Sequence, residues 1–255
     1  MDEKSIVPSS SKVPKPKQDE VVKVPKLELE EAFRASTEQV LYLDVSASML
    51  SEWPDAPEIS RAKAARSLAE KLINEWLGTA ICYVFDGSVR SLWSEARSNS
   101  GVSLPSPNKL RGEHLKRAMS ALRFDGTSTD IIRVFRDASM RARVGMARRA
   151  MEVLIVTDGF DSALVGWRPG AIHPLTEFVE ALRQASVPVS VVHVAPTGVV
   201  DDYLYCSEEL RRVCQYTGGK YSRVSTAKEF EQAMIRYWES PRLPEPLRLL
   251  TEGEK

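Results

Sequence analysis

The feature that most constrains this 255-residue chain is a series of short, continuously apolar segments that alternate with amphipathic ones. The apolar segments predict buried strands at 40–44, 80–85, 153–157, 187–194 and 221–224. Between them, apolar residues at helical spacing predict helices at 58–77, 108–122, 131–143, 173–185, 201–216 and 227–238. Strands that are apolar on both faces, alternating with helices, indicate an α/β fold. We therefore predict a doubly wound, mostly parallel sheet with helices on both faces.

One strand is expected to run against the others. Asp86-Gly87 follows the second apolar run and predicts a hairpin turn into residues 89–93. Parallel sheets of this kind commonly carry one antiparallel edge strand. We expect loops around Pro54 and Pro57, and again over residues 94–107, which are rich in Ser, Pro and Asn.

The two ends of the chain differ from the middle in composition. Residues 1–35 contain four prolines among Ser and Lys, and residues 241–255 begin with three closely spaced prolines. Such segments bury too little apolar surface to offset their conformational entropy. We predict one domain over residues 36–240, with a flexible tail at each end.

Charge and cysteine usage exclude several classes of protein. The chain has 35 Lys and Arg against 35 Asp and Glu, which argues against nucleic-acid binding by bulk electrostatics and against a polybasic membrane anchor. Its three scattered cysteines fit neither a disulfide framework nor a zinc motif. No apolar run approaches the length of a membrane span, and the first residues lack the apolar core of a secretory signal. We expect a soluble, cytoplasmic protein.

Polar side chains collect in three loops, two of which follow predicted strands. Asp44 ends the first strand, and Ser46 and Ser48 follow it at alternate positions. Thr127 lies after Gly126 in a second loop, and Asp158 follows the strand at 153–157. In open α/β sheets, ligands bind at the carboxyl ends of the strands. Carboxylates and hydroxyls are the hard oxygen donors that Mg²⁺ prefers, so these loops predict a cation site.

The order Asp-x-Ser-x-Ser, Gly-Thr and Thr-Asp-Gly resembles the metal-ion-dependent adhesion site of von Willebrand factor type A domains, over roughly residues 36–240. The resemblance implies a Rossmann-like fold and a Mg²⁺ or Mn²⁺ ion that binds another protein, often through an acidic side chain. It implies a binding module that is not an enzyme, within a multi-protein assembly or beside an AAA+ ATPase. By motif match, the metal ligands would be Asp44, Ser46, Ser48, Thr127 and Asp158.

The sequence departs from the family pattern at two positions. Ala47 stands where the family frequently has Gly, and Asp125 stands where it often has the first Gly of a Gly-Gly pair. Neither change removes a ligand. Asp125 would add negative charge near the site if it faced inward, and we keep it as a candidate partner contact. Trp53 and Trp167 fall in loops at the same edge, either as packed loop residues or as aromatic anchors for a partner.

Two other functions stay open at this point. A strand that ends in Asp, with Asp161 downstream, also resembles Mg²⁺-dependent phosphohydrolases, but Ser46 replaces their second acid. Arginines between residues 133 and 149 raise the alternative of an RNA contact, and the Ro ribonucleoproteins carry a type A domain. Those arginines spread around more than half of the predicted helix, and the helical-repeat region that binds most of the Ro RNA is missing. A nucleic-acid partner is therefore not expected.

Overall fold

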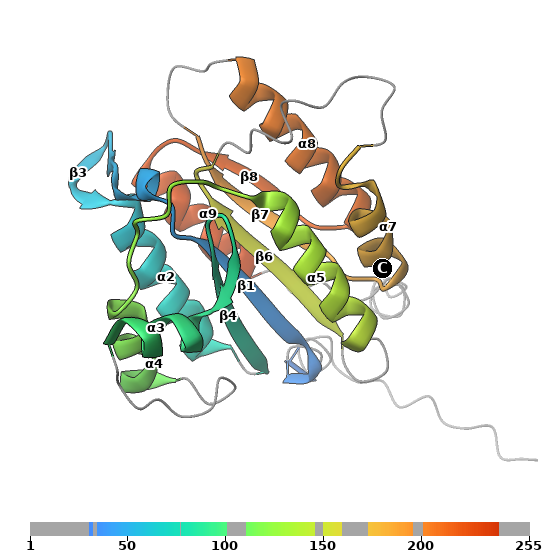
Figure 1. Ribbon diagram of the computed structural model, residues 1–255, viewed down its shortest axis with the longest axis horizontal. Coiled ribbons are helices and arrows are strands. Elements are labelled where there is room, and N and C mark those ends of the chain that lie inside the picture. The colour runs from blue at the N-terminus through green and yellow to red at the C-terminus, as the bar shows by residue number, and fades with distance from the viewer. Residues whose placement is uncertain are drawn as a thin grey trace, which may run out of the picture.

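The fold was analysed in a computed structural model (Figure 1). It describes residues 31–32, 35–76, 78–100, 111–145, 150–159, 173–195 and 201–239. Trp167, Asp161 and nearly all of the two predicted tails lie outside these residues, and the predicted domain limits stay predictions.

A six-stranded sheet forms the centre of the molecule, with strands in the order β5-β4-β1-β6-β7-β8. The strands are β1 (Glu38–Asp44), β4 (Thr79–Phe85), β5 (Val89–Ser91), β6 (Met151–Thr157), β7 (Val189–Val194) and β8 (Tyr221–Val224). All neighbouring pairs are parallel except β4 and β5, which form the antiparallel hairpin at one edge. The predicted mostly parallel sheet with one antiparallel edge strand is confirmed.

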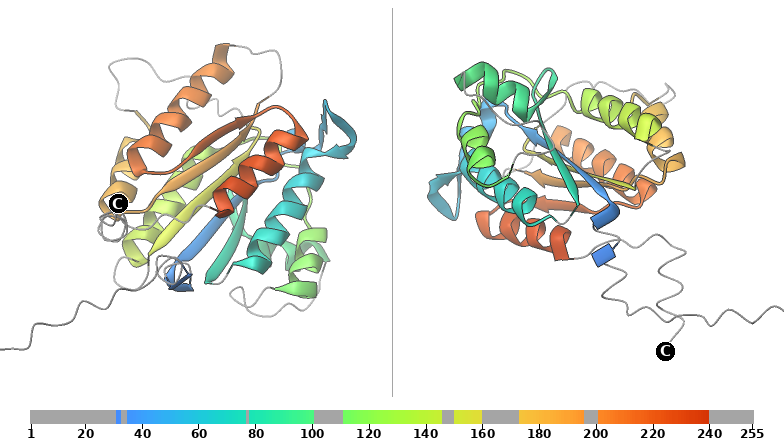
Figure 2. Two further views of the ribbon diagram at one scale, coloured as in Figure 1. Left: turned by 180° about the vertical axis from the view of Figure 1, so that it is seen from behind. Right: turned by 90° about the horizontal axis from the view of Figure 1, so that it is seen from below.

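Helices cover both faces of this sheet (Figures 1 and 2). On one face lie α2 (Arg61–Glu75), α3 (Leu92–Ser100), α4 (Gly112–Ser120) and α9 (Ala227–Glu239). On the other lie α5 (Ile131–Gly145), α7 (Thr176–Gln184) and α8 (Asp201–Thr217). The predicted doubly wound α/β fold is therefore present, and no helix of the described residues is long and apolar enough to cross a membrane.

The central strand β1 shows why the chain folds this way. Leu41 and Leu43 point into the α2 side of the core, while Val40 and Tyr42 point into the α5 side. Each side chain is fully or almost fully buried, and each such burial stabilises the fold by about 1.5–3 kcal/mol. Because both faces of the strand are covered, its central residues are apolar or aromatic, and the carboxylate of Asp44 lies where the strand ends.

Two elements differ from the sequence-based expectation. A small hairpin, β2 (Glu52–Trp53) with β3 (Ala56–Ser60), occupies the stretch that we expected as a loop running into a helix at 58. The helix α2 starts at Arg61 because Ser60 accepts a hydrogen bond from the Lys63 N–H (3.2 Å) and caps it. Helix α3 takes residues 92–93 from the expected strand and residues 94–100 from the expected loop. It is held by the buried Leu92 and Ala96 one turn apart.

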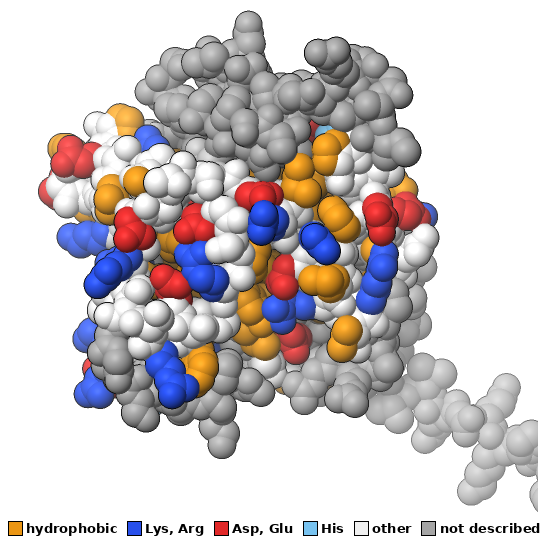
Figure 3. Space-filling model, viewed as in Figure 1, with side chains coloured by type: hydrophobic (Ala, Val, Ile, Leu, Met, Phe, Trp, Pro, Cys, Tyr) orange, Lys and Arg blue, Asp and Glu red, His pale blue; other side chains and the backbone are white. Residues whose placement is uncertain are grey.

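The face that carries α5 mixes acidic and basic side chains (Figure 3). Arg133 pairs with Asp130, Arg141 with Asp137, and Arg143 with Glu177 on α7. The Arg141 guanidinium also lies over the ring of Tyr83. Three of the arginines that raised the RNA alternative are therefore already paired with carboxylates, as on a solvated helix face.

Candidate metal centre

Three loops meet at the carboxyl end of β1 and β6. The first loop leaves β1 and forms a short 3₁₀ helix, η1 (Ala47–Leu50). The second loop precedes α5, and its Gly126 pairs with Ser46 as a parallel bridge. The Ala47 N–H donates to the Gly126 carbonyl (2.9 Å), and the Gly126 N–H donates to the Val45 carbonyl (3.3 Å). Main-chain hydrogen bonds therefore fix the first two loops to each other before any side chain is considered.

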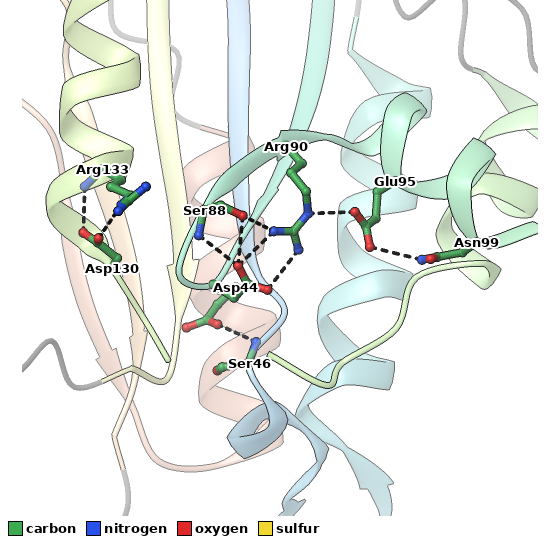
Figure 4. Close-up of polar contacts among 9 residues, drawn as sticks. Asp44, Ser46, Ser88, Arg90, Glu95, Asn99, Asp130 and Arg133 are labelled. Atoms are coloured by element: carbon green, nitrogen blue, oxygen red, sulfur yellow. Dashed lines mark hydrogen bonds and ion pairs between the residues drawn. The ribbon is translucent and has the colours of Figure 1, made fainter. Parts of the chain in front are cut away.

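Asp44 lies at the bottom of this site and is fully buried. Its Oδ1 accepts the Ser46 N–H (2.8 Å), as Figure 4 shows, and its Oδ2 accepts the Thr157 hydroxyl (2.6 Å). Burial raises the pKa of Asp44 to about 6; the Thr157 hydrogen bond opposes this rise, and the nearby charge of Asp158 adds to it. Both partners of the carboxylate are neutral donors, so no positively charged side chain contacts Asp44 among the described residues.

A chain of hydrogen bonds links the first loop to the third. The Ser46 and Ser48 hydroxyl oxygens lie 3.0 Å apart, and the Ser48 hydroxyl donates to Asp158 Oδ1 (2.8 Å). The second oxygen of Asp158 accepts from Arg61 Nη1 (3.0 Å). Burial raises the pKa of Asp158 in spite of these two donors. Four of the five predicted ligands, Asp44, Ser46, Ser48 and Asp158, are thus brought together.

The fifth predicted ligand, Thr127, is placed differently. Its side chain is exposed and lines a polar hollow with Asp86 and Arg90, on the β4–β5 side of the site. Thr129, two residues later, lies against the third loop: a Cβ built on Gly159 would stand 2.7 Å from the Thr129 Oγ1. Thr129 is therefore in close contact with Gly159, the residue after Asp158. The next residue, Asp130, caps the first turn of α5 by accepting the Arg133 N–H at Oδ1 (3.0 Å).

The hollow beside the site is lined by a separate ion-pair network (Figure 4). Arg90 contacts both carboxylate oxygens of Asp86 (2.9 Å each) and Glu95 (2.7 Å). These hydrogen bonds hold the pKa of Asp86 below its usual value, and Ser88 contributes to the same effect. Asp125 is exposed at the rim of this hollow, so it does not point into the Asp44 site.

The two tryptophans have different outcomes. Trp53 is not at the surface: it is 1% exposed and packs against Phe230 of α9, with ring centroids 5.4 Å apart. Of the two alternatives for Trp53, this burial fits the packed loop residue and contradicts the partner anchor, because the β2–β3 hairpin turns the indole inward. Trp167 lies outside the described residues. The large apolar side chain that is exposed beside the site is Leu50, at the end of η1, which is 56% exposed.

The donor set suits a hard divalent cation. The described residues contain no group of three or more His, Cys, Asp or Glu side chains that would hold a metal by themselves. The site instead combines two carboxylates with serine and threonine hydroxyls, which are oxygen donors of the kind Mg²⁺ and Mn²⁺ accept. Arg61 already places one cationic group on Asp158, so the site attracts positive charge within this very structure.

Comparisons with known proteins identify the fold. No protein-family model matches the sequence, and no curated protein matches it. The N-terminal domain of TFIIH p34 has a similar structure, with a TM-score of 0.54 and 11% identity, over 80% of this chain and 98% of that one. Proximal thread matrix protein 1 from the mussel byssus gives a TM-score of 0.52 and 14% identity over 80% of this chain. A further structure of it, with a zinc-occupied MIDAS motif, gives a TM-score of 0.50 and 13% identity.

The chain spans about half the length of the mussel protein (47%). The PilB minor pilin of Streptococcus sanguinis is also similar, with a TM-score of 0.52 and 12% identity over 81% of this chain and 61% of that one. At these identities the likeness concerns the fold alone. The chain therefore has the α/β fold of von Willebrand factor type A domains, with its polar loops at the carboxyl edge of the sheet.

Proposed function

We propose that this protein is a metal-ion-dependent protein-binding module that is not an enzyme. A Mg²⁺ or Mn²⁺ ion would be held by Asp44, Ser46, Ser48, Asp158 and a threonine of the second loop. The motif match gives Thr127 for this role, and we choose Thr129 because it lies against Gly159. The bound ion would supply an electrophilic site at which a carboxylate of a partner protein binds. The observation that carries the proposal is the continuous hydrogen-bonded set from Asp44 to Asp158 at the carboxyl edge of the sheet.

The chemistry of this set favours binding over hydrolysis. Ser46 takes the position where phosphohydrolases of the resembling class have a second acid for proton transfer. Asp44 is fully buried and both of its oxygens accept hydrogen bonds, which leaves it a poor nucleophile. Leu50, exposed beside Ser48, offers an apolar contact at the rim of the site, where a partner residue next to the bound carboxylate would pack.

The setting of the module is also a proposal. The structural neighbours include the N-terminal domain of TFIIH p34, a thread matrix protein of the mussel byssus and a minor pilin. We propose that this chain acts within a multi-protein assembly, and an AAA+ ATPase beside it in the cytoplasm stays a prediction. Asp125, exposed next to the second loop, is a candidate partner contact there.

Two experiments, a metal titration and then a partner capture, test the proposal. Isothermal titration of the purified protein with MnCl₂ should show one site that Asp44→Asn abolishes. Glu231→Gln, an exposed change on α9 away from the site, should leave it intact. Partner capture from the native extract should then require Mg²⁺, be lost in chelator, and be lost with Asp44→Asn. Capture that is indifferent to both would refute the proposal, and phosphoester turnover that depends on Asp44 would favour the hydrolase.

A further inference from the structure

Arg61 is a cation that the chain itself supplies to the candidate site. It is the first residue of α2, and its Nη1 lies 3.0 Å from Asp158 Oδ2. The pair is well shielded from water, with side-chain exposures of 14% for Arg61 and 1% for Asp158. Because Ser48 donates to the other oxygen of Asp158, both oxygens of this carboxylate are engaged by protein groups.

The β2–β3 hairpin explains how Arg61 reaches this position. The hairpin leaves η1 and returns the chain to it, so that the Arg61 N–H donates to the Ser51 carbonyl (3.0 Å). Arg61 is thereby tied to the loop that carries Ser48. The first turn of α2 contains no acidic residue, so the positive end of the helix dipole adds to the guanidinium charge.

The charges of the site show what Arg61 does to cation binding. Two carboxylates, Asp44 and Asp158, face one guanidinium, which halves the negative charge available to an incoming ion. A guanidinium and a divalent ion that share one carboxylate repel each other, and the shielding from water leaves this repulsion only weakly screened.

We propose that Arg61 is an internal counter-ion that Mg²⁺ or Mn²⁺ must displace from Asp158, so that it weakens metal binding and makes the site respond to metal concentration. This inference rests on the proposed function, because it assumes that the site takes a divalent ion. With the guanidinium on Asp158, the carboxylate stays satisfied in the metal-free protein. With the metal bound, the guanidinium moves away from it but stays near the site through its main-chain tether to Ser51.

The experiment compares Mn²⁺ affinity, measured from the electron paramagnetic resonance signal of free Mn²⁺, in full-length wild type and two variants. Arg61→Gln removes the charge that contacts Asp158 and should bind Mn²⁺ about tenfold more tightly. Lys63→Gln removes the same charge from an exposed side chain in the same turn of α2 and should stay within about twofold of wild type. The metal-free Arg61→Gln variant should also unfold at a lower temperature than wild type, and Mn²⁺ should raise its unfolding temperature by more.

The outcomes separate this inference from the function on which it rests. If wild type binds Mn²⁺ and Arg61→Gln binds it no more tightly, Arg61 is not a competitor, and the metal-binding proposal still stands. If Lys63→Gln tightens binding as much as Arg61→Gln does, the effect is one of distant charge and the displacement is refuted. If neither wild type nor Arg61→Gln binds Mn²⁺, both proposals fail. Binding by Arg61→Gln alone supports the inference in its strongest form.

A measurement on the wild-type protein keeps the inference testable even if Arg61→Gln does not fold. Mg²⁺ should shift the side-chain Nε–Hε resonance of Arg61 in a ¹⁵N correlation spectrum. This shift should saturate at the same Mg²⁺ concentration that saturates metal binding. The corresponding resonance of Arg183, which pairs with Glu180 on α7, should not move. An Arg61 resonance that stays in place while Mg²⁺ saturates the site would overturn the displacement.

Discussion

Replacement of Gly159 by alanine tests the approach of the second and third loops most directly. Gly159 follows Asp158, is buried, and donates its N–H to the Thr157 hydroxyl (2.9 Å). An added Cβ would stand 2.3 Å from Cγ2 of Thr129 and 2.7 Å from its Cβ, where real contacts essentially never fall below 3.0 Å. Because the nearest atoms sit on a short, tied-down loop, one loop must retreat, and such overpacking typically costs about 1–3 kcal/mol.

We expect Gly159→Ala to lower the free energy of unfolding by this amount in urea titrations followed by circular dichroism. Thr129→Ser removes Cγ2, the closest atom, and should relieve part of the clash. The double variant should therefore lose about 1 kcal/mol less than the sum of the two single changes. A Gly159→Ala protein as stable as wild type, or strict additivity in the double variant, would show that Thr129 does not lie against Gly159.

Three further predictions concern the second loop, the core and a buried histidine. Thr129→Val should weaken Mn²⁺ binding by about tenfold and Thr127→Val by less than twofold in calorimetric titrations; equal losses would contradict our choice of Thr129. Trp53→Ala should cost about 3–5 kcal/mol of unfolding free energy and Leu50→Ala less than about 0.5 kcal/mol, and the reverse order would place Trp53 at the surface. Burial lowers the pKa of His193 from 6.5 to about 4, so its contribution to stability is complete above pH 6.5 and is lost as the pH falls through 4. Relative to His193→Gln, wild type should lose about 3 kcal/mol over this range in urea unfolding, and parallel pH profiles would refute the assignment.

The sheet could be predicted from sequence because its strands are covered on both faces. Strands β1 and β6 are buried along nearly their whole length, so each appears as an unbroken apolar run that ends in an acid. Helix α3 could not be predicted, because Leu92 and Ala96 are the only fully buried side chains described in it, among Ser, Arg and Asn. It is helical because it packs against the sheet and α4, and the spacing of its own residues does not indicate these contacts.

In the candidate site too, the residues next to buried strands could be predicted and those placed by tertiary contacts could not. Asp44, Ser46 and Asp158 lie within two residues of strand ends, so the fold alone carries them to one edge. The second loop is held by hydrogen bonds at both ends, through the Ser46–Gly126 bridge and the Asp130 cap of α5. Which of its threonines faces the site depends on these tertiary contacts, which the local sequence does not specify. The contact of Arg61 with Asp158 could not be predicted either, because it depends on the β2–β3 hairpin. The sequence of that hairpin does not show the alternation of apolar and polar residues that indicates a strand.

The two carboxylates of the site differ in one respect that predicts opposite effects of neutralising them. Asp158 has a cationic partner, whereas Asp44 has only the Ser46 N–H and the Thr157 hydroxyl. A buried anion without a cation destabilises the fold, and the pKa of about 6 caused by its burial corresponds to about 3 kcal/mol at pH 7.

In chelator at pH 7, Asp44→Asn should therefore be at least as stable as wild type, by up to about 3 kcal/mol. Asp158→Asn leaves the Arg61 guanidinium without its carboxylate and should be about 2 kcal/mol less stable, since Arg61 keeps some contact with water. In Mg²⁺ the order should change, because wild type alone retains both carboxylates and gains stability from the ion. A different result would contradict this argument: Asp44→Asn could lose as much stability in chelator as Asp158→Asn does. The Asp44 carboxylate would then already be stabilised by its hydrogen bonds in the metal-free protein, and its burial would not be evidence for a bound cation.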